Sequence, residues 1–465
     1  MIRQKQVQTD ITHGSVPKGI LLYFMPIFFG SLFQQLYNTV DAVIVGNFVG
    51  TKALGAVGGS AGQLAGIVFN LLAGIASGAT VTVAQHFGAQ NLKAVHRDIH
   101  NSVTLAVIGS LIMTVLGILV SRPLFVAMST PEDLLEESLV YIKILFVGLP
   151  VAFLFNMGSG ILRALGDSKR PLYYLIVCCF VNIFMDLLFV AVFQMGVVGA
   201  AVATNIAQTV SAVLVIRQLM RLPEEFRLKI RELRIYPDVL KAQLRIGLPG
   251  GFSSSLYGIA NMIIQSAINS LGTATVAAHA AFTKLDSLYW LVNSAFGIAV
   301  TTFVGQNYGA GRMDRVKQST RWTLVYDVVG SLAIGALMVF GGNILMRLFT
   351  DSEEVVTIGV RMAVTMCPFY FLFCFIEVLS GSLRGLGNVL VPTVLTLSGI
   401  CVLRVVWTFV VVPMNPVLET VMAVFPISWG VTAVLFIIYY LFAWNRIAKR
   451  TDSRNSMHIS KNKSI

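Results

Sequence analysis

Long apolar segments separated by short polar ones run through this chain of 465 residues. Charge-free runs such as 19–40, 53–85 and 246–283 exceed the about 20 apolar residues that a helix needs to cross a hydrocarbon core of about 30 Å. Twelve such segments are centred near residues 32, 67, 107, 150, 181, 207, 255, 290, 330, 368, 400 and 430. Strands of a membrane barrel would be about 10 residues long with alternating polarity. The pattern therefore predicts an all-α polytopic membrane protein with twelve transmembrane helices.

Composition and charge agree with this topology. Apolar residues make up 56% of the chain and charged residues 12%, about half the roughly 25% of a soluble domain. With an inside N-terminus, 27 of the 34 Lys and Arg residues fall on the cytoplasmic side of the predicted spans. We therefore expect an inner (plasma) membrane protein with both termini in the cytoplasm. The net charge of +12 then reflects topology, and we expect no nucleic-acid partner.

The two halves of the chain are related by a shift of 221 residues. The segment 83–89 (VAQHFGA) falls on 304–310 (VGQNYGA), and 159–166 (SGILRALG) falls on 380–387 (SGSLRGLG). Six spans separate the equivalent positions, so the halves share one orientation, as in parallel-repeat transporters. The predicted organisation is a cytoplasmic tail (1–16), an N-terminal six-helix lobe (17–220), a linker (221–240), a C-terminal six-helix lobe (241–445) and a basic cytoplasmic tail (446–465).

Repeats of this kind serve transporters, because two lobes can rock around a cavity and expose it to one side at a time. A structural or receptor bundle is the alternative. The sequence contains no His-rich metal cluster, no Ser/His/Asp constellation and no Walker A motif, so we expect no enzyme activity, no cofactor and no direct use of ATP. Coupling to an H⁺ or Na⁺ gradient is the remaining source of energy.

Acidic residues inside membrane spans are costly and usually functional. Asp41 in the first span and Asp186 in the fifth each lie about seven residues, or roughly 10 Å, from the outer end, and Thr204 in the sixth span lies at similar depth. Asn182 precedes Asp186 by one helical turn. Two neighbouring carboxylates in a low-dielectric cavity do not both ionise readily, which suits a proton site. With the oxygens of Asn182 and Thr204, the same group also suits Na⁺.

Other polar residues share helical faces with these acids or with their repeat equivalents. The spacing of Gln34, Asn38 and Asp41 places them on one face, and Gln208 lies one turn after Thr204. We predict a substrate cavity lined by Gln34, Asn38, Asn156, Gln208, Asn261 and Gln265. Hydrogen bonding between helices is the alternative role for the amides and for Thr204.

The C-terminal half does not repeat the acid pair. Ile264 stands opposite Asp41 and Trp407 opposite Asp186. The C-terminal lobe instead carries Lys284, Asp286, His279, Glu377 and Arg404. We expect internal ion pairs for Lys284 with Asp286 and for Arg404, packing for His279, and a possible gating role for Glu377. Pro26 removes a helix hydrogen bond and bends the first span; protonation of Asp41 can couple to that bend, or the bend is static.

At these residues the sequence resembles the multidrug and toxic compound extrusion (MATE) family. The segment 34–46 (QQLYNTVDAVIVG) is similar to its first helix, and the paired VAQ/VGQ and LRALG/LRGLG motifs recur in both of its halves. The resemblance covers about residues 15–445. It implies a V-shaped, twelve-helix antiporter that exports amphipathic, often cationic, compounds by alternating access in exchange for H⁺ or Na⁺.

The acid in the first helix, with Asn182, Asp186 and Thr204, resembles the DinF-like and archaeal branch, in which the matching residues form the cation site. Asn156 also matches a cavity position of that branch. The seventh helix reads 251–255 (GFSSS), without the acid of the NorM-like branch. We expect a monomer that contacts membrane lipid and a small organic substrate. The alternatives are a lipid-linked precursor flippase of the same superfamily, which needs a basic cavity, and a non-transporting receptor or channel.

Overall fold

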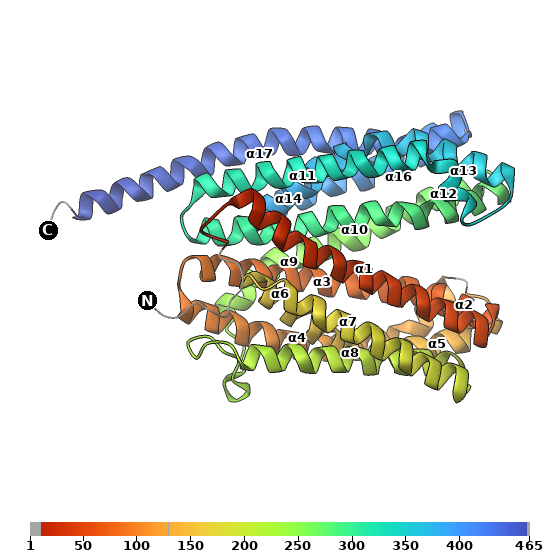
Figure 1. The fold of residues 1–465 in the computed structure, drawn as a ribbon, viewed down its shortest axis with the longest axis horizontal. Coiled ribbons are helices and arrows are strands. Elements are labelled where there is room, and N and C mark those ends of the chain that lie inside the picture. Colours follow the sequence, from red (N-terminus) through yellow and green to blue (C-terminus); the bar gives the residue numbers. More distant parts are fainter. Residues whose placement is uncertain (1–10, 129, 463–465) are drawn as a thin grey trace. The chain divides into compact units, whose positions relative to one another are not determined.

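The computed structural model describes residues 11–128 and 130–462, and these residues form helices joined by short turns (Figure 1). Among them, 10 helical segments are long and apolar enough to cross a membrane, and the bent pair α5 (Glu132–Val147) and α6 (Leu149–Ala164) adds an eleventh. A further helix of 33 residues, α9 (Pro237–Asn269), carries a more polar N-terminal part. The predicted all-α membrane architecture is confirmed, and the number of spans is roughly consistent with the predicted twelve. Residues 1–10 and 463–465 of the predicted tails lie outside the described residues.

The first compact unit contains residues Leu21–Ser255. Its helices lie largely antiparallel, and α7 and α8 run side by side (Figure 1). Besides α5 and α6 it holds most of α1 (Val16–Phe48), α2 (Thr51–Gly58), α3 (Ser60–Gly88), α4 (Leu92–Ala127), α7 (Lys169–Asp186), the π-helical η1 (Leu187–Val192), α8 (Gly196–Met220), the short η2 (Ile230–Glu232) and the first part of α9.

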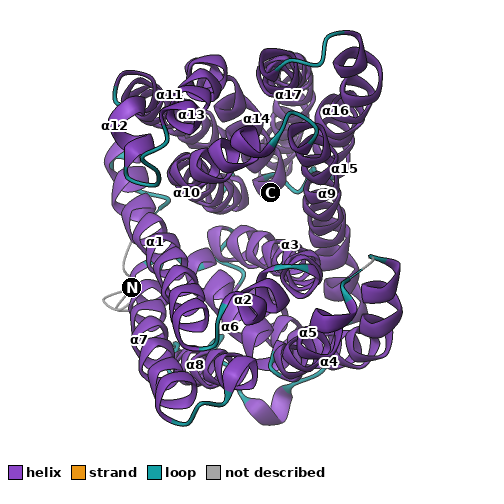
Figure 2. Cartoon of the chain, turned by 90° about the vertical axis from the view of Figure 1, so that its right-hand side faces the viewer, coloured by secondary structure: helices purple, strands orange, loops and turns teal. Residues whose placement is uncertain are grey.

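The second compact unit contains residues Ile11–Ile20 and the chain from Leu256 onward. Helix α14 lies between α10 and α17 in its interior (Figure 2). The unit holds α10 (Thr273–Gly309), α11 (Met313–Phe340), α12 (Gly342–Arg347), α13 (Glu353–Met366), η3 (Cys367–Phe369), α14 (Tyr370–Gly385), α15 (Leu390–Thr396), η4 (Leu397–Val402), α16 (Leu403–Val406), η5 (Trp407–Val411), η6 (Val412–Met414) and α17 (Leu418–Asn462).

The sequence repeat is visible in the backbone of the turns. The motif LRALG ends α6 in a Schellman turn, in which Gly166 (φ 92) bonds to the carbonyl of Arg163 and the next amide bonds to the carbonyl of Leu162. The motif LRGLG ends α14 in the same way, with Gly387 at φ 80 bonded to Arg384. Glycine is required there because the left-handed conformation is costly for a residue with a Cβ atom. The paired motifs therefore specify equivalent helix ends.

A close crossing joins the first part of α9 to α3. Gly74 and Gly78 share one face of α3, and Gly247 and Gly251 share one face of α9. A Cβ atom on Gly74 would lie 2.3 Å from the Cα atom of Gly251, and one on Gly78 would lie 2.2 Å from the backbone oxygen of Gln243. Small residues let two membrane helices approach to backbone contact, where dispersion forces and weak hydrogen bonds hold them together.

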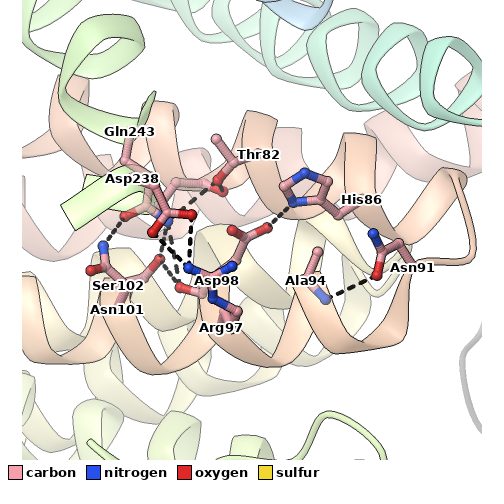
Figure 3. Close-up of polar contacts among 11 residues, drawn as sticks. Thr82, His86, Asn91, Ala94, Arg97, Asp98, Asn101, Ser102, Asp238 and Gln243 are labelled. Carbon is pink, nitrogen blue, oxygen red and sulfur yellow. Dashed lines mark hydrogen bonds and ion pairs between the residues drawn. The ribbon is translucent and has the colours of Figure 1, made fainter. Parts of the chain in front are cut away.

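A buried polar cluster completes this contact at one end of the crossing (Figure 3). Gln243 of α9 is fully buried, accepts a hydrogen bond from Asn101 at 2.9 Å and donates to Ser102 at 2.9 Å and to Thr82 at 3.3 Å. Nearby, Arg97 donates to both carboxylate oxygens of Asp238, at 2.6 and 2.7 Å. Because each buried amide atom has a partner, the cluster fixes the start of α9 to α3 and α4.

The segment between the two repeats packs against α4 in the same unit. The backbone N–H of Lys229 donates to His100 Nε2 at 3.0 Å, and His96 lies 2.9 Å from Glu232. The ammonium group of Lys229, 3.2 Å from Glu232, holds the pKa of that exposed carboxyl below its usual range. The connection is thus anchored before α9 begins.

Two arginines of the second unit anchor residues 11–14, and Arg312 donates to the carbonyl oxygen of Thr12 at 2.9 Å. Arg315 of α11 is buried and donates to the carbonyl oxygens of Ile11, His13 and Gly14 at 2.9 to 3.2 Å. Its Nε also donates to Asn307 Oδ1 at 3.0 Å. The guanidinium fork satisfies several backbone acceptors at once, which a lysine cannot do with the same geometry.

We predict that Gly78→Val disrupts the crossing of α3 and α9, because the new side chain meets backbone atoms that have no freedom to rotate away. Detergent-purified Gly78→Val should show a lower thermal unfolding temperature or fail to yield monodisperse protein. Gly66→Val on the same helix is the matched control, since a Cβ atom there meets nothing within 4 Å. Equal unfolding temperatures for the two variants would contradict the assignment of this crossing.

Candidate functional site

A cavity in the first unit is lined by residues from α1, α3, α5, α6 and α8. Its wall combines one acid, several amides and hydroxyls, and aromatic rings. The lining residues are Tyr37, Asn38, Asp41, Gly62, Ala65, Phe69, Tyr141, Leu145, Gly148, Ala152, Thr204, Asn205 and Gln208. No Lys or Arg is among them. The cavity therefore presents an electronegative, partly aromatic surface.

Two carboxyl groups meet at one side of this cavity. Asp41 of α1 lies in the cavity wall, while Asp186 of α7 is completely buried and interacts electrostatically with Asp41. Asn182, one turn earlier on α7, is also completely buried. Within the described part of the chain, Asp41 Oδ1, both Asp186 oxygens and both amide atoms of Asn182 lack a hydrogen-bond partner.

Such a concentration of unsatisfied buried oxygen atoms is unusual, because buried polar groups are normally paired. Two adjacent carboxylates removed from water can be accommodated by sharing a proton or by binding a cation. Carboxylate and amide oxygens are hard ligands of the kind that alkali and alkaline-earth cations prefer. The donor set formed by Asp41, Asn182 and Asp186, with the Thr204 hydroxyl in the same cavity wall, therefore fits either H⁺ or Na⁺.

The six residues predicted to contact substrate are distributed over several places. Asn38 and Gln208 line the cavity, whereas Gln34 is exposed on α1 and Asn156 donates to the carbonyl of Ala152 in its own helix at 2.9 Å. The other two lie in the second unit. Asn261 accepts a hydrogen bond from Arg404 at 2.7 Å, and Gln265 donates to Asn269 at 2.9 Å.

Sequence reasoning missed the two tyrosines beside the acid pair. Tyr37 and Tyr141 are both buried, both line the cavity and both interact electrostatically with Asp41. Tyr37 precedes Asp41 by four residues, so helical periodicity places it on the same face and gave a usable signal. Tyr141 lies on α5, and no local pattern in the sequence connects it to Asp41.

The fourth predicted span is broken where it borders the cavity. Helices α5 and α6 meet at an angle of 49° around Gly148. Asn205 of α8 occupies the space at the break, since a Cβ atom on Gly148 would lie 1.9 Å from its Oδ1 atom. Its Nδ2 atom donates to the carbonyl of Ile144 at 2.6 Å. The Gly148 N–H also donates to this carbonyl, at 3.3 Å, so a side chain from a neighbouring helix adds a shorter hydrogen bond where the helix ladder is stretched.

A second irregularity follows Asp186 directly. Helix α7 ends at Asp186 and continues as the π-helical η1, and the equivalent place in the other half holds the π-helical η5. One-turn π segments widen a helix locally and occur often at functional sites.

The expected ion pairs of the C-terminal half are wrong for the residues that the structure describes. Lys284 is exposed, while Asp286, two positions later and on another face of α10, accepts from Trp290 Nε1 at 2.7 Å and from the Tyr370 hydroxyl. Arg404 is fully buried, and no ion pair with a carboxylate is found for it among the described residues. It bonds to Asn261 and lies 4.9 Å from the Tyr257 ring centre and 4.6 Å from that of Phe425.

The remaining residues to which sequence reasoning assigned a gating or packing role are placed as follows. Glu377 is partly buried in the middle of α14 and lies 3.9 Å from Arg384. His279 is half-buried on α10. Pro26 is buried within α1, which continues as one helix through it.

Comparison with known proteins relates the whole chain to one family. Residues 26–188 and 249–410 match the family model described as MatE, once in each half. The chain is 28% identical over 442 residues to the probable multidrug resistance protein YoeA of Bacillus subtilis (strain 168), covering 93% of this chain and 95% of that protein. It is 30% identical over 404 residues to the probable multidrug resistance protein YpnP of the same organism, covering 86% and 89%.

Solved structures show the same fold. A MOP superfamily transporter from Pyrococcus furiosus Vc1 superimposes with a TM-score of 0.88 at 24% identity, covering 95% of this chain and 98% of that one. At this level of identity the likeness extends to the arrangement of helices. It agrees with the twelve-helix architecture described above.

We predict that Asn205→Leu lowers the stability of the protein, because the Ile144 carbonyl at the helix break loses its shorter hydrogen bond, at 2.6 Å, and keeps only the 3.3 Å bond from the Gly148 N–H. The expected cost is on the order of 1 kcal/mol, seen as a lower thermal unfolding temperature in detergent. Thr209→Val is the matched control: this exposed residue lies one turn later on α8 and bonds only within its own helix. If both variants unfold at the wild-type temperature, Asn205 does not support the break.

Proposed function

This chain belongs to the MatE family of multidrug efflux transporters, and from the acid pair of its N-terminal half we propose that it exports small amphipathic, cationic organic compounds in exchange for H⁺ or Na⁺. The family consists of multi-pass membrane transporters rather than enzymes. The bias of Lys and Arg toward one side of the spans supports an inner-membrane location with both termini in the cytoplasm.

The observation that carries this proposal is the contact of Asp41 with Asp186 at the wall of the cavity. Asp41 Oδ1 and both Asp186 oxygens are buried and lack hydrogen-bond partners among the described residues, so an ion taken up here replaces the missing interactions. Asp41 also faces the cavity, while Asp186 does not. One carboxyl group is thus positioned to respond both to a ligand in the cavity and to an ion held by the pair.

The polarity of the cavity favours a cationic ligand over an anionic one. Its lining includes Asp41 and the rings of Tyr37, Phe69 and Tyr141, and cations are attracted both by carboxylates and by aromatic faces. A flippase for a lipid-linked precursor needs basic residues to hold a pyrophosphate, and this lining contains none. The flippase is therefore the weaker candidate for this cavity.

Exchange follows from competition for the same acid pair. When Asp41 and Asp186 bind H⁺ or Na⁺, their negative charge is neutralised and the cavity loses affinity for a cationic compound. When the ion leaves, the charge returns and the compound binds. Because exchange of one H⁺ or Na⁺ for one monovalent cationic compound moves no net charge, the concentration gradient of the ion is the driving force, and a hundredfold gradient supplies about 2.7 kcal/mol and supports about a hundredfold accumulation.

We predict that Asp41→Asn and Asp186→Asn each abolish gradient-driven transport. Proteoliposomes that contain purified protein and a cationic dye would receive an imposed pH or Na⁺ gradient separately, and dye movement would be followed by fluorescence. In each variant the gradient-dependent accumulation should fall from about the size of the imposed concentration gradient toward one, because the neutral amide keeps the size of the side chain but cannot exchange a proton.

The matched control is Asp351→Asn, which makes the same substitution at an exposed turn residue and should transport like wild type. Wild-type rates in Asp41→Asn would overturn the coupling site. Dye movement through the wild-type protein at a rate that neither gradient changes would instead support the channel alternative. A response to only one of the two gradients identifies the coupling ion.

A further inference from the structure

The second unit buries carboxyl groups of its own, although the acid pair of the first half is not repeated there. Asp286 on α10 is 7% exposed and is held by Trp290 and Tyr370. Glu377 on α14 lies 3.9 Å from Arg384. The third, Asp327 on α11, has neither two strong donors nor a basic neighbour, and sequence reasoning did not single it out.

Asp327 lies in the interior of the helix packing. It is 0% exposed, and at 14 residues from the start of α11 it lies about 21 Å along that helix. Its Oδ2 atom accepts one hydrogen bond, from Asn293 Nδ2 of α10 at 3.0 Å. Its Oδ1 atom is buried and has no hydrogen-bond partner in the part of the chain that the structure describes.

The groups that face Asp327 offer it no counter-charge. Tyr289 on α10 and the Cys374 thiol and Glu377 carboxyl on α14 all interact electrostatically with it. The charged residues of the neighbouring α12 and α13 are exposed: Arg347 pairs with Glu353, Arg361 pairs with Glu419, and Glu354 faces outward. The basic residues of α11 itself lie in its first three turns. Asp327 is therefore surrounded by neutral or acidic groups.

An ionised carboxylate in that environment is strongly unfavourable. Its charge is removed from water, no cation compensates it, and the acidic Glu377 opposes it. An asparagine would fill the same space at lower cost, so packing alone does not account for an acid here. A bound proton removes the charge and gives Oδ1 or Oδ2 a hydrogen to donate.

A metal cation fits less well than a proton. Na⁺ needs several oxygen ligands, whereas the atoms that approach Asp327 are an amide N–H and a thiol. Ser331 lies one turn away on α11, and its hydroxyl is engaged with Cys374 Sγ at 2.9 Å. The set around Asp327 is thus poor in free oxygen atoms.

We propose that Asp327 is a proton-binding carboxyl group of the C-terminal half, separate from the Asp41 and Asp186 pair. This proposal goes beyond the coupling function assigned to that pair and does not depend on it. Glu377 supplies a nearby second carboxyl for proton exchange. Glu377 lies about 12 Å before Gly385, the last residue of α14. That end of α14 contacts the first turns of α11, where Ser382 bonds to Thr320 at 2.8 Å.

Infrared spectroscopy of the full-length protein in lipid films tests the proposal, because protonated and ionised carboxyl groups absorb at separate frequencies. The difference spectrum of wild type minus Asp327→Asn at neutral pH should contain one protonated-carboxyl band, which shifts on exchange into D₂O. Asp351→Asn is the matched control and should remove only ionised-carboxylate bands. If Asp327→Asn does not fold, Asp327→Glu should shift the protonated band rather than remove it.

The same measurement in an Asp41→Asn/Asp186→Asn background separates this proposal from the coupling function, since the Asp327 band should persist there at full intensity. A difference spectrum that shows loss of ionised-carboxylate bands at neutral pH would overturn the proposal. So would a protonated band that disappears when sodium chloride is added at constant pH, because that result identifies Na⁺ as the ligand.

Discussion

The cost of removing a carboxyl group from water inside a membrane protein governs the chemistry of this molecule. Such a group is retained only if it shares a proton, binds a cation or meets a counter-charge. Arg404, a fully buried cation of the C-terminal half, is stabilised by Asn261 and two aromatic rings. Asp41 and Asp186 have neither a basic neighbour nor a full set of hydrogen-bond donors among the described residues. A mobile ion is therefore the partner that we propose for them.

The scaffold around these groups is more symmetric than the groups themselves. Equivalent Schellman turns end α6 at Gly166 and α14 at Gly387, and π segments occupy equivalent places in η1 and η5. The side chains on this scaffold differ between the halves. The first unit joins two acids at a cavity, whereas the second buries Asp327 among neutral groups and the acidic Glu377. Duplication explains the helix ends, and later divergence of side chains explains the separate ion chemistry.

The sequence predicted features that depend on local pattern, and it failed where a contact comes from a distant helix. The membrane spans could be predicted because each is a long apolar run. The repeat could be predicted because its motifs recur at a shift of 221 residues. Helical spacing predicted that Asp41 and Thr204 face one cavity, and both line it. The coupling roles of these residues and of Asp186 are proposals that the transport experiments test. The break at Gly148 was not predictable, because Asn205 of another helix supports it. Lys284 and Asp286 were paired by proximity in sequence, although two positions on a helix face different ways.

One measurement tests the coupling assignment most directly. Proteoliposomes without any ion gradient would receive an outward gradient of a cationic substrate, and uptake of H⁺ and of Na⁺ would be recorded with separate internal indicators. If Asp41 and Asp186 exchange an ion for substrate, efflux of the compound drives uptake of one of these cations, and Asp41→Asn abolishes that uptake. Substrate efflux with no cation uptake, or cation uptake that persists in Asp41→Asn, would contradict the account.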